Sequence, residues 1–205
     1  MRYGMVIDLT KCVGCNACTA ACKQTNITPP GVFWSKVVLY ETGSYPQARL
    51  HFLPMLCMHC QDAPCLEACP TGATYRGEGG LVLVDDDRCV GCRYCIMACP
   101  YEARSYNTTR PKDYYPGQEP TVIEVVNSGQ HPKGAIEKCN FCAPRLREGK
   151  LPACVATCPA EARIFGDLDD PGSEVSKLVA SGMARPRLDE QGTNPSVFYI
   201  EVEPK

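Results

Sequence analysis

Sixteen of the 205 residues are cysteines, and they fall into four groups of four with none left over. The first and third groups have the spacing C-x2-C-x2-C-x3-C, the second widens the middle gap to four residues, and the fourth widens it to eleven. Three groups end in the related phrases CPTGA, CPYEA and CPAEA, so one unit repeats along the chain. The groups are Cys12, Cys15, Cys18 and Cys22; Cys57, Cys60, Cys65 and Cys69; Cys89, Cys92, Cys95 and Cys99; and Cys139, Cys142, Cys154 and Cys158.

Thiols this close together can form disulfides, bind zinc or bind iron-sulfur clusters. Disulfides need particular Cα separations and directions, which three cysteines at C-x2-C spacing meet poorly. Structural zinc usually takes two C-x2-C pairs separated by a longer loop. In bacterial-type ferredoxins, three cysteines of such a run bind one cluster, and the fourth, ahead of proline, binds the neighbouring cluster. We therefore predict four 4Fe-4S clusters, with a zinc-bound structural module as the alternative.

The connections between the groups indicate which of them share a lobe. Residues 70–88, between the second and third groups, have a length suited to the turn and strands inside a two-cluster ferredoxin, and the first and fourth groups then pair by exclusion. The predicted fold is α+β, with two interlocked bacterial-type ferredoxin-like lobes and loop insertions: residues 57–100 form one lobe, and residues 1–56 with 101–205 form the other. The predicted ligand sets are Cys12, Cys15, Cys18 and Cys158; Cys139, Cys142, Cys154 and Cys22; Cys57, Cys60, Cys65 and Cys99; and Cys89, Cys92, Cys95 and Cys69.

Short apolar runs lead into two of the groups. Residues 5–9 and 81–84 predict strands that feed the cysteine loops. Gly14 and Gly91 lie inside a C-x2-C turn, where a residue without Cβ lets the backbone fold tightly. The x3 gap before each last cysteine is one helical turn, and we expect the proline that follows in three groups to end that helix.

The C-terminal segment predicts structure rather than chemistry. Asp170 is expected to cap a helix that begins at Pro171 and runs to about Ala180, with Gly182 just beyond its end. Residues 197–202 predict a strand that closes a sheet edge or docks on a partner.

Composition excludes several function classes. The formal charge of −2 leaves no basic face, which argues against nucleic acid as a partner. No apolar run approaches the roughly 18 residues of a membrane-spanning helix, and no secretion signal is expected at the start, so membrane attachment would come through a partner. With every cysteine assigned, and only His51, His59 and His131 as histidines, we predict no catalytic residues.

The order of the groups resembles the iron-sulfur electron-transfer (beta) subunits of complex iron-sulfur molybdoenzymes, the DMSO reductase family. It is most similar to those of polysulfide, thiosulfate and respiratory arsenate reductases. The resemblance covers essentially the whole chain and includes GMVIDLTKCVGC at 4–15, CNFCAPRLREGKLPACVATCPAEAR at 139–163 and IFGDLDDPGSEVSKL at 164–178. Residues 101–138 are longer than in the shorter polysulfide-type subunits.

This resemblance implies an electron-transfer role in anaerobic respiration. It implies a catalytic partner subunit with a molybdenum or tungsten bis-molybdopterin-guanine-dinucleotide centre, and a membrane quinol-binding subunit or cytochrome. It also implies a peripheral location on the periplasmic face by co-export with the catalytic subunit, with the cytoplasm as the alternative. The subunit of a formate dehydrogenase or hydroxytransferase, and a free-standing polyferredoxin, are the alternatives for function.

A few other residues could serve function or structure. Residues 110–120 are expected to form a solvated loop, with partner binding as the alternative. Trp34 is expected to pack under the loop between the first two groups rather than to relay electrons. His59 is expected beside the ligands or at the surface rather than as a ligand. Arg145 and Arg147 could screen cluster charge or lie in an ordinary solvated loop.

Overall fold

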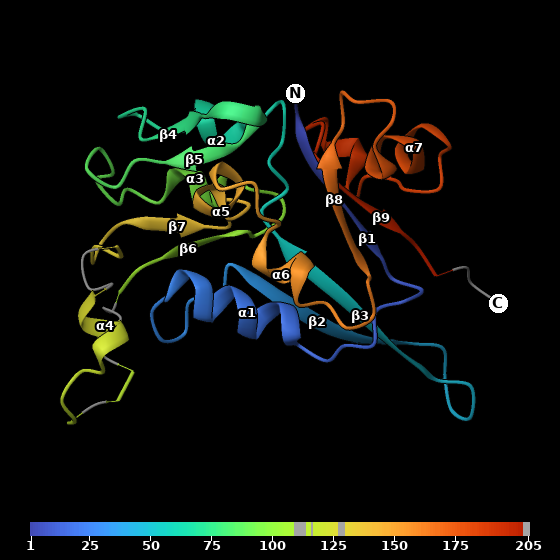
Figure 1. The fold of residues 1–205 in the computed structure, drawn as a ribbon, viewed down its shortest axis with the longest axis horizontal. Coiled ribbons are helices and arrows are strands. Elements are labelled where there is room, and N and C mark those ends of the chain that lie inside the picture. The colour runs from blue at the N-terminus through green and yellow to red at the C-terminus, as the bar shows by residue number, and fades with distance from the viewer. Residues whose placement is uncertain (109–113, 116, 127–129, 203–205) are drawn as a thin grey trace.

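Strands and short helices alternate along the chain. The computed structural model describes residues 1–108, 114–115, 117–126 and 130–202 (Figure 1). The strands are β1 Tyr3–Asp8, β2 Ser35–Thr42, β3 Arg49–Leu56, β4 Thr74–Arg76, β5 Val82–Val84, β6 Arg104–Tyr106, β7 Ile136–Lys138, β8 Arg163–Asp167 and β9 Val197–Ile200. The helices are α1 Ala17–Asn26, α2 Pro64–Glu67, α3 Tyr94–Met97, α4 Val122–Val126, α5 Ala143–Arg147, α6 Ala153–Ala156 and α7 Glu174–Ala180, with 3-10 turns η1 Glu78–Gly80 and η3 Asp189–Gln191.

The sheets connect the cysteine groups in a closed cycle. In the part of the chain that the structure describes, β2 pairs with β3, β4 with β5 and β6 with β7, all antiparallel. Each of these pairs joins the strand after one group to the strand before the next group. The antiparallel pair β8 and β1 completes the cycle, because β8 follows the fourth group and β1 precedes the first. The strand pairs therefore link the first group to the second, the second to the third, the third to the fourth, and the fourth back to the first.

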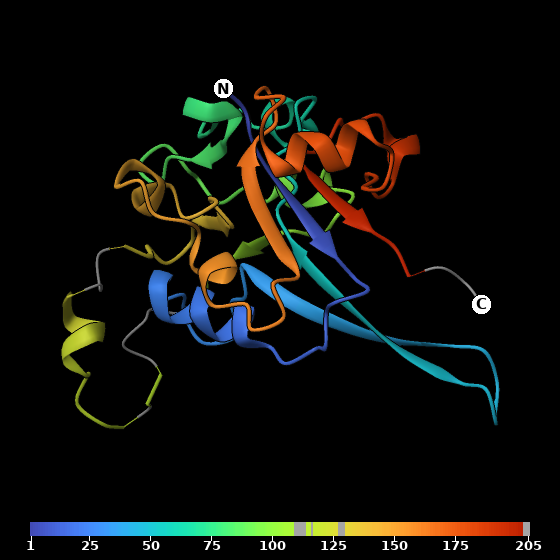
Figure 2. The ribbon, with the colours of Figure 1, turned by 45° about the vertical axis from the view of Figure 1, so that its right-hand side comes forward.

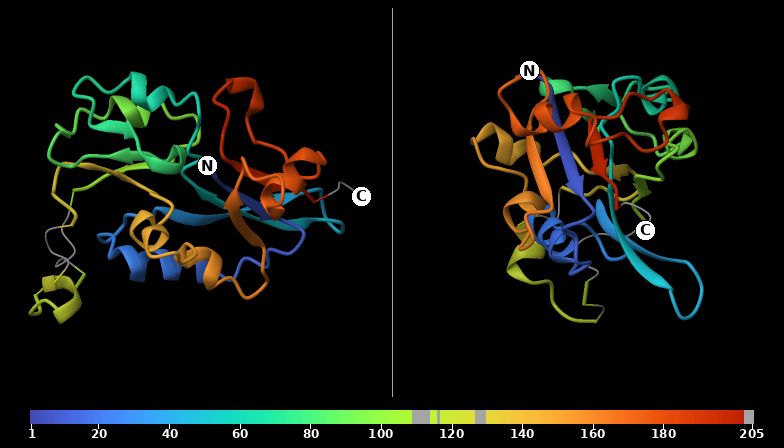
Figure 3. Two further views of the ribbon diagram at one scale, coloured as in Figure 1. Left: turned by 45° about the horizontal axis from the view of Figure 1, so that its top comes forward. Right: turned by 90° about the vertical axis from the view of Figure 1, so that its right-hand side faces the viewer.

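The two ends of the chain meet in one three-stranded sheet of order β8-β1-β9 (Figure 3). Strand β1 lies in the middle and is antiparallel to β8 and parallel to β9. Helix α7 covers one face of this sheet, where Val175 packs with Val6 and Phe198 in a small apolar cluster. The predicted C-terminal strand is confirmed as an edge strand, although it ends at Ile200 rather than at residue 202.

Helix α7 begins later than the sequence predicts. The cap is Ser173, whose Oγ accepts a hydrogen bond from the Ser176 N–H at 3.1 Å. Asp170 instead accepts from the N–H of Gly172 at 2.8 Å, which makes a turn before the helix. The prediction of an Asp170 cap was therefore wrong. Asp170 and Ser173 are both good capping residues, and the helix is capped by Ser173, which directly precedes its first residue. The predicted end at Ala180 is confirmed.

The third cysteine of each group lies in a helix, in α1, α2, α3 and α6. Helix α1, whose last cysteine is followed by Lys23, continues for 10 residues, whereas α2, α3 and α6 have 4 residues each and end before the cysteine that precedes proline. The residue before a proline disfavours helical backbone, because the proline ring clashes with it. Each of these three cysteines therefore lies beyond the end of its helix.

The predicted strands and turns of the cysteine loops are present. Strand β1 begins two residues before the predicted run and β5 covers nearly all of its run. Gly14 and Gly91 both have φ of +67°, the left-handed region that glycine adopts at little cost. A Cβ at Gly14 would collide with the Phe52 ring, and one at Gly91 with the Gly134 carbonyl oxygen. Both positions thus need glycine for conformation and for space.

Two segments extend from the body. The β2–β3 hairpin projects away from the three-stranded sheet (Figure 2), and α4 lies on an excursion at the opposite side (Figure 1). The predicted loop at 110–120 lies partly outside the described residues. Around it, β6 and β7 pair and α4 forms, so the inserted region carries secondary structure of its own.

Candidate metal centres

The structure gathers the cysteines into four sites. All sixteen lie in the described part of the chain, and all are free thiols. Three of the predicted sets each line one small cavity. In the remaining set, the thiol of Cys60 lies among those of Cys57, Cys65 and Cys99, whose charges help to raise its pKa. We number the sites as follows: site 1, Cys12, Cys15, Cys18 and Cys158; site 2, Cys22, Cys139, Cys142 and Cys154; site 3, Cys57, Cys60, Cys65 and Cys99; site 4, Cys69, Cys89, Cys92 and Cys95.

The last cysteine of each group lies with a different group. Cys99 is near Cys57 and Cys65, and Cys69 lines a cavity with three members of the third group. In three groups the short helix ends before the last cysteine, so the chain turns away from its own group there, whereas Cys22 reaches the fourth group from within α1. This is the exchange that the ferredoxin pattern predicts.

Three of the four cysteine sets surround a cavity. In the described residues, no three His, Cys, Asp or Glu side chains converge where one metal ion could be bound. Tetrahedral zinc, with Zn–S bonds of about 2.3 Å, would draw its sulfur ligands to within about 4 Å of each other. A cavity lined by four cysteines, as at sites 1, 2 and 4, fits a polynuclear cluster with four thiolate corners.

Burial and crowding raise the pKa of several of the free thiols, which makes them hard to ionise. Burial, reinforced by neighbouring thiolates, raises the pKa of Cys22 and of Cys60 to about 12. It also raises the pKa of Cys139 well above its ordinary value. Four adjacent thiolates would repel one another strongly, so they need a cationic centre between them. A bound metal cluster would supply that positive charge.

Backbone N–H groups already point at several sulfur atoms. Thr74 donates to Cys69 Sγ at 3.4 Å and Ala162 donates to Cys158 Sγ at 3.3 Å. Burial acts to raise the pKa of Cys69, but hydrogen bonds from the backbone around Thr74 lower it to about 7. Such donors stabilise a thiolate, and in iron-sulfur proteins they also influence the reduction potential. The donor set therefore fits a 4Fe-4S cluster.

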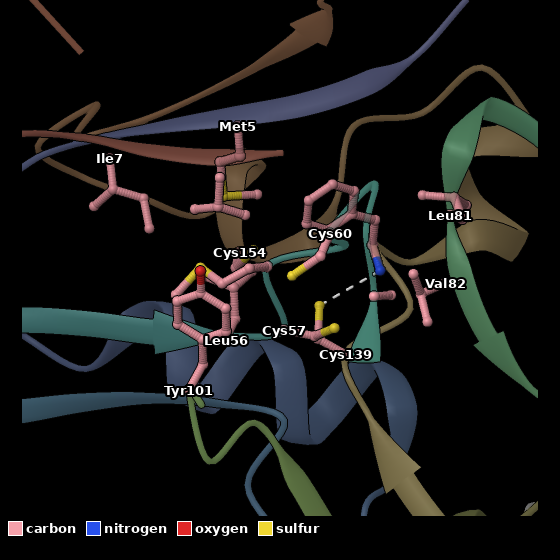
Figure 4. Close-up of a cluster of buried hydrophobic side chains, with 14 of the residues drawn as sticks. Met5, Ile7, Leu56, Cys57, Cys60, Leu81, Val82, Tyr101, Cys139 and Cys154 are labelled. Carbon is pink, nitrogen blue, oxygen red and sulfur yellow. Dashed lines mark hydrogen bonds between the residues drawn. The ribbon is translucent and has the colours of Figure 1, made fainter. Parts of the chain in front are cut away.

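The four sites lie in a row. The charge of Cys18 in site 1 reaches Cys154 in site 2, and that of Cys65 in site 3 reaches Cys95 in site 4. Between the middle sites, Cys57 and Cys139 interact, and Figure 4 shows them side by side. The cysteines classed as exposed are Cys15 and Cys92, one in each end site.

Comparison with known proteins agrees with these sites. Residues 48–113 with 125–168, and separately residues 11–73, match families described as 4Fe-4S dicluster domains. The chain is 42% identical to the arsenate respiratory reductase iron-sulfur subunit of Shewanella sp. strain ANA-3, over 98% of this chain and 96% of that protein. It is 44% identical to a selenate reductase subunit of Mesobacillus selenatarsenatis, over 98% and 72%. It is also 44% identical to a provisionally named dimethyl sulfoxide reductase iron-sulfur subunit of Halobacterium salinarum, over 98% and 80%.

The chain belongs to the iron-sulfur electron-transfer subunits of complex iron-sulfur molybdoenzymes. In this family catalysis resides in a separate subunit, and the iron-sulfur subunit transfers electrons through 4Fe-4S clusters. Among the residues that the structure describes, no helix has the length and apolar character needed to cross a membrane.

The sequence analysis missed three buried cations of this electron-transfer subunit, Arg104, Lys138 and Arg163. Arg104 Nη2 donates to Cys65 Sγ at 3.0 Å. None of the three has a carboxylate within ion-pair distance in the described residues. Leaving a buried charge unpaired costs about 3–5 kcal/mol, so these side chains fit an anionic group held between the cysteines. A sequence signal existed for two of them, since each arginine follows a last cysteine by five positions, in CPYEAR and CPAEAR.

The other histidine and tryptophan predictions can now be placed in the subunit. His59 is buried, its Nδ1 accepts from the Val82 N–H at 3.1 Å, and its ring packs on Phe141 with centroids 4.0 Å apart. It therefore lies beside the ligands and not at the surface. Trp34 Nε1 donates to Glu137 at 3.3 Å and the ring meets His131 edge-on, which ties the loop between the first two groups to the inserted region.

The two arginines of the fourth group have different surroundings. Arg145 Nε donates to the Leu151 carbonyl at 2.9 Å, which closes the loop between Cys142 and Cys154. Arg145 and Arg147 both line an open cavity of about 490 Å³ beside site 2. Screening of a cluster by their charge stays a prediction.

Proposed function

We propose that this subunit holds four 4Fe-4S clusters in sites 1 to 4 and conducts electrons between a molybdopterin catalytic subunit and a membrane quinone or cytochrome partner. The observation that carries the proposal is the row of four sites with an exposed cysteine at each end. When bound, the clusters accept and release single electrons. The chain holds each one by four thiolates and keeps the middle sites away from water.

Two ferredoxin-like lobes, residues 57–100 and residues 1–56 with 101–205, would interlock around this row. The β4–β5 pair lies inside the first of these lobes and the β1–β8 pair inside the second. The β2–β3 and β6–β7 pairs also lie inside the second lobe, on either side of the first lobe in the sequence. Contacts between the lobes support an interlocked arrangement over two separate domains. Arg104 of the second lobe donates to Cys65 Sγ of the first at 3.0 Å, and Lys138 of the second lobe donates to the Val82 carbonyl of the first.

An exposed apolar residue lies beside each exposed cysteine. Val13, two positions before Cys15, is 62% exposed, and Val90, two positions before Cys92, is 68% exposed. Single exposed apolar side chains are common on protein surfaces, but here one lies in each loop that carries an exposed cysteine. A partner that covers either loop would come close to the end cluster, which shortens the electron path. We infer that the two loops receive different partners.

The reaction served is the reduction of an oxyanion or sulfur compound in anaerobic respiration, of the polysulfide, thiosulfate or arsenate reductase type. The arsenate and selenate reductase relatives are about equally similar to this chain, at 42% and 44% identity. The similarity therefore supports a common electron-transfer part, with the substrate chosen by the catalytic subunit. We further propose that the complex is peripheral to the membrane on the periplasmic side, reached by export together with the catalytic subunit.

Metal analysis of the purified complex tests the cluster content. We expect about 16 iron and about 16 acid-labile sulfide from each copy of this chain, in addition to the iron that the partner subunits hold, and a co-purifying large subunit with molybdenum or tungsten. Stoichiometric zinc without sulfide would overturn the proposal. A lone chain without a molybdenum or tungsten partner would remove the reductase assignment and favour a free-standing polyferredoxin.

Docking is tested with Val13→Asp and Val90→Asp. We expect each variant to lose a different partner on co-purification and to keep its iron. Met183→Asp is the matched control, because Met183 is 60% exposed but lies near α7, away from both ligand loops. Loss of the same partner from both variants, or of none, would contradict the two-ended arrangement.

A further inference from the structure

Three cations are buried within the row of sites. In the described part of the chain, Arg104, Lys138 and Arg163 are the buried lysine and arginine side chains, with exposed fractions of 4–6%. The largest charge interaction of each is with a cysteine thiolate: Cys65 for Arg104, Cys57 for Lys138 and Cys154 for Arg163. Each of the three lies where two neighbouring sites meet.

Arg163 lies at the junction of sites 1 and 2. Burial acts to lower its pKa, but the thiolates of Cys154 in site 2 and Cys18 in site 1 outweigh burial and raise it. The guanidinium is held by a hydrogen bond from Nη2 to Ser35 Oγ at 3.1 Å and a contact of Nη1 with Met5 Sδ at 3.8 Å. Both partners are neutral, so they do not neutralise the positive charge of Arg163, which acts on sites 1 and 2.

Arg104 lies at the junction of sites 3 and 4, in the same repeat position as Arg163. Its Nη2 donates to Cys65 Sγ in site 3, and its charge also reaches Cys95 in site 4. Nη1 donates to Thr74 Oγ1 at 3.1 Å. Thr74 follows its own last cysteine by five positions, so it occupies the repeat position that the arginines occupy elsewhere. The repeat that ends with Cys99 thus supplies the cation, and the repeat that ends with Cys69 supplies its neutral hydrogen-bond partner.

Lys138 lies at the remaining junction, between sites 2 and 3. Its Nζ donates to the carbonyl oxygen of Cys139 in site 2 at 2.9 Å and to that of Val82. Burial lowers the pKa of Lys138 and the charge of Arg104 acts in the same direction, whereas the thiolates of Cys57 in site 3 and Cys139 in site 2 favour its charged form. Strand β7 places it there, directly before the first cysteine of the fourth group.

We propose that one buried cation at each junction raises the reduction potential of the two clusters beside it. In each transfer of an electron between neighbouring clusters, one cation then stabilises the reduced form of both the donor and the acceptor cluster. This inference rests on the proposed ligand sets. A cluster gains one negative charge when it is reduced, so a nearby cation stabilises the reduced form more than the oxidised form. Burial keeps solvent and salt from screening this interaction, and a cation between two clusters acts on both.

The test is an EPR-monitored redox titration of the purified complex. Arg104→Gln is expected to lower the potentials of the clusters in sites 3 and 4, each by at least a tenfold change in the reduction equilibrium, which is about 59 mV for one electron. Arg163→Gln should act in the same way on sites 1 and 2, and Lys138→Met on sites 2 and 3. Clusters that do not flank the changed residue should move much less.

Two further variants separate charge from structure. Arg104→Lys keeps the cation and should leave the potentials near those of the unmodified protein. Arg88→Gln is the matched control, because Arg88 directly precedes Cys89 as Lys138 precedes Cys139, yet its side chain is exposed and donates to the Thr71 carbonyl. We expect Arg88→Gln to shift the site 4 potential by far less than Arg104→Gln does.

Each outcome decides the inference. Loss of iron from the two flanking sites in Arg104→Gln, with retention in Arg104→Lys, also supports it, because the charge is then required to hold the clusters. Equal shifts at all four clusters, no shift, or equal behaviour of the Gln and Lys variants would overturn it. The unmodified protein shows separately whether the proposed function fails, since about 16 iron atoms must be present before any variant is interpreted.

Discussion

Replacing Cys99 by serine distinguishes crossed ligation from ligation within one group. Cys99 follows the third group in sequence, yet its thiol lies near Cys57 and Cys65 of site 3. If the sites bind clusters as proposed, Cys99→Ser removes one thiolate from site 3 and none from site 4. The variant should then damage the cluster that is distant in sequence and leave the adjacent one intact.

The expected magnitude follows from four sites with four iron atoms each. Complete loss of one cluster lowers the iron content from about 16 to about 12 per chain, and conversion to a three-iron cluster lowers it to about 15. Sites 1 and 2 should be unaffected, since Cys99 belongs to neither. The EPR spectrum of the reduced protein should accordingly lose one signal.

The signal is assigned by reference variants that do not involve crossing. Cys60→Ser marks site 3 and Cys92→Ser marks site 4, because each lies within the compact run of its own group. We expect Cys99→Ser to reproduce the spectrum of Cys60→Ser, and Cys69→Ser to reproduce that of Cys92→Ser. If Cys99→Ser instead matches Cys92→Ser, the crossed ligand sets and the order of the row are both refuted.

Three further predictions concern stability, each measured by urea unfolding of the purified protein. Ser173→Ala should cost about 1 kcal/mol, because the helix loses its cap, and Asp170→Ala less than half of that; the reverse order would restore the Asp170 cap. Leu168→Ala should cost about 2–4 kcal/mol without loss of iron, since Leu168 packs in the apolar cluster under α7; a cost below about 1 kcal/mol would mean that this cluster does not anchor the sheet. For His131, burial acts to lower the pKa, but the hydrogen bond and charge of Glu137 raise it above the ordinary 6.5. Its charged form therefore adds stability below pH 6.5 that is lost as pH rises through the raised pKa, so the difference in unfolding free energy from His131→Gln should shrink over that range.

Much of the local structure could be predicted because its causes are local. The helical turn of the x3 gap and the glycine turns at Gly14 and Gly91 depend on residues within one loop. The cap of α7 could not be predicted, since Asp170 and Ser173 are both good caps. The choice of cap depends on the position of the end of β8, because Ser173 Oγ also donates to the carbonyl of Asp167, the last residue of that strand.

His59 shows a similar limit at the site. Its place between two cysteines indicated a position near the ligands, and the structure agrees. Nothing nearby in sequence indicated its burial, which depends on Val82 from β5 and Phe141 from the fourth group. Contacts of this kind join segments that are far apart along the chain, so a pattern within one segment cannot contain them.

The sequence by itself determined the cysteine content, the repeat, the cluster type that the spacing suits and the family, because a ligand loop is encoded within a few residues. Only the tertiary structure decided that the sites form a row and that Arg163, Lys138 and Arg104 occupy its three junctions. The physical reason is that charges act through space: Arg104 reaches Cys65 across 39 positions of sequence, and β1 meets β8 across nearly the whole chain.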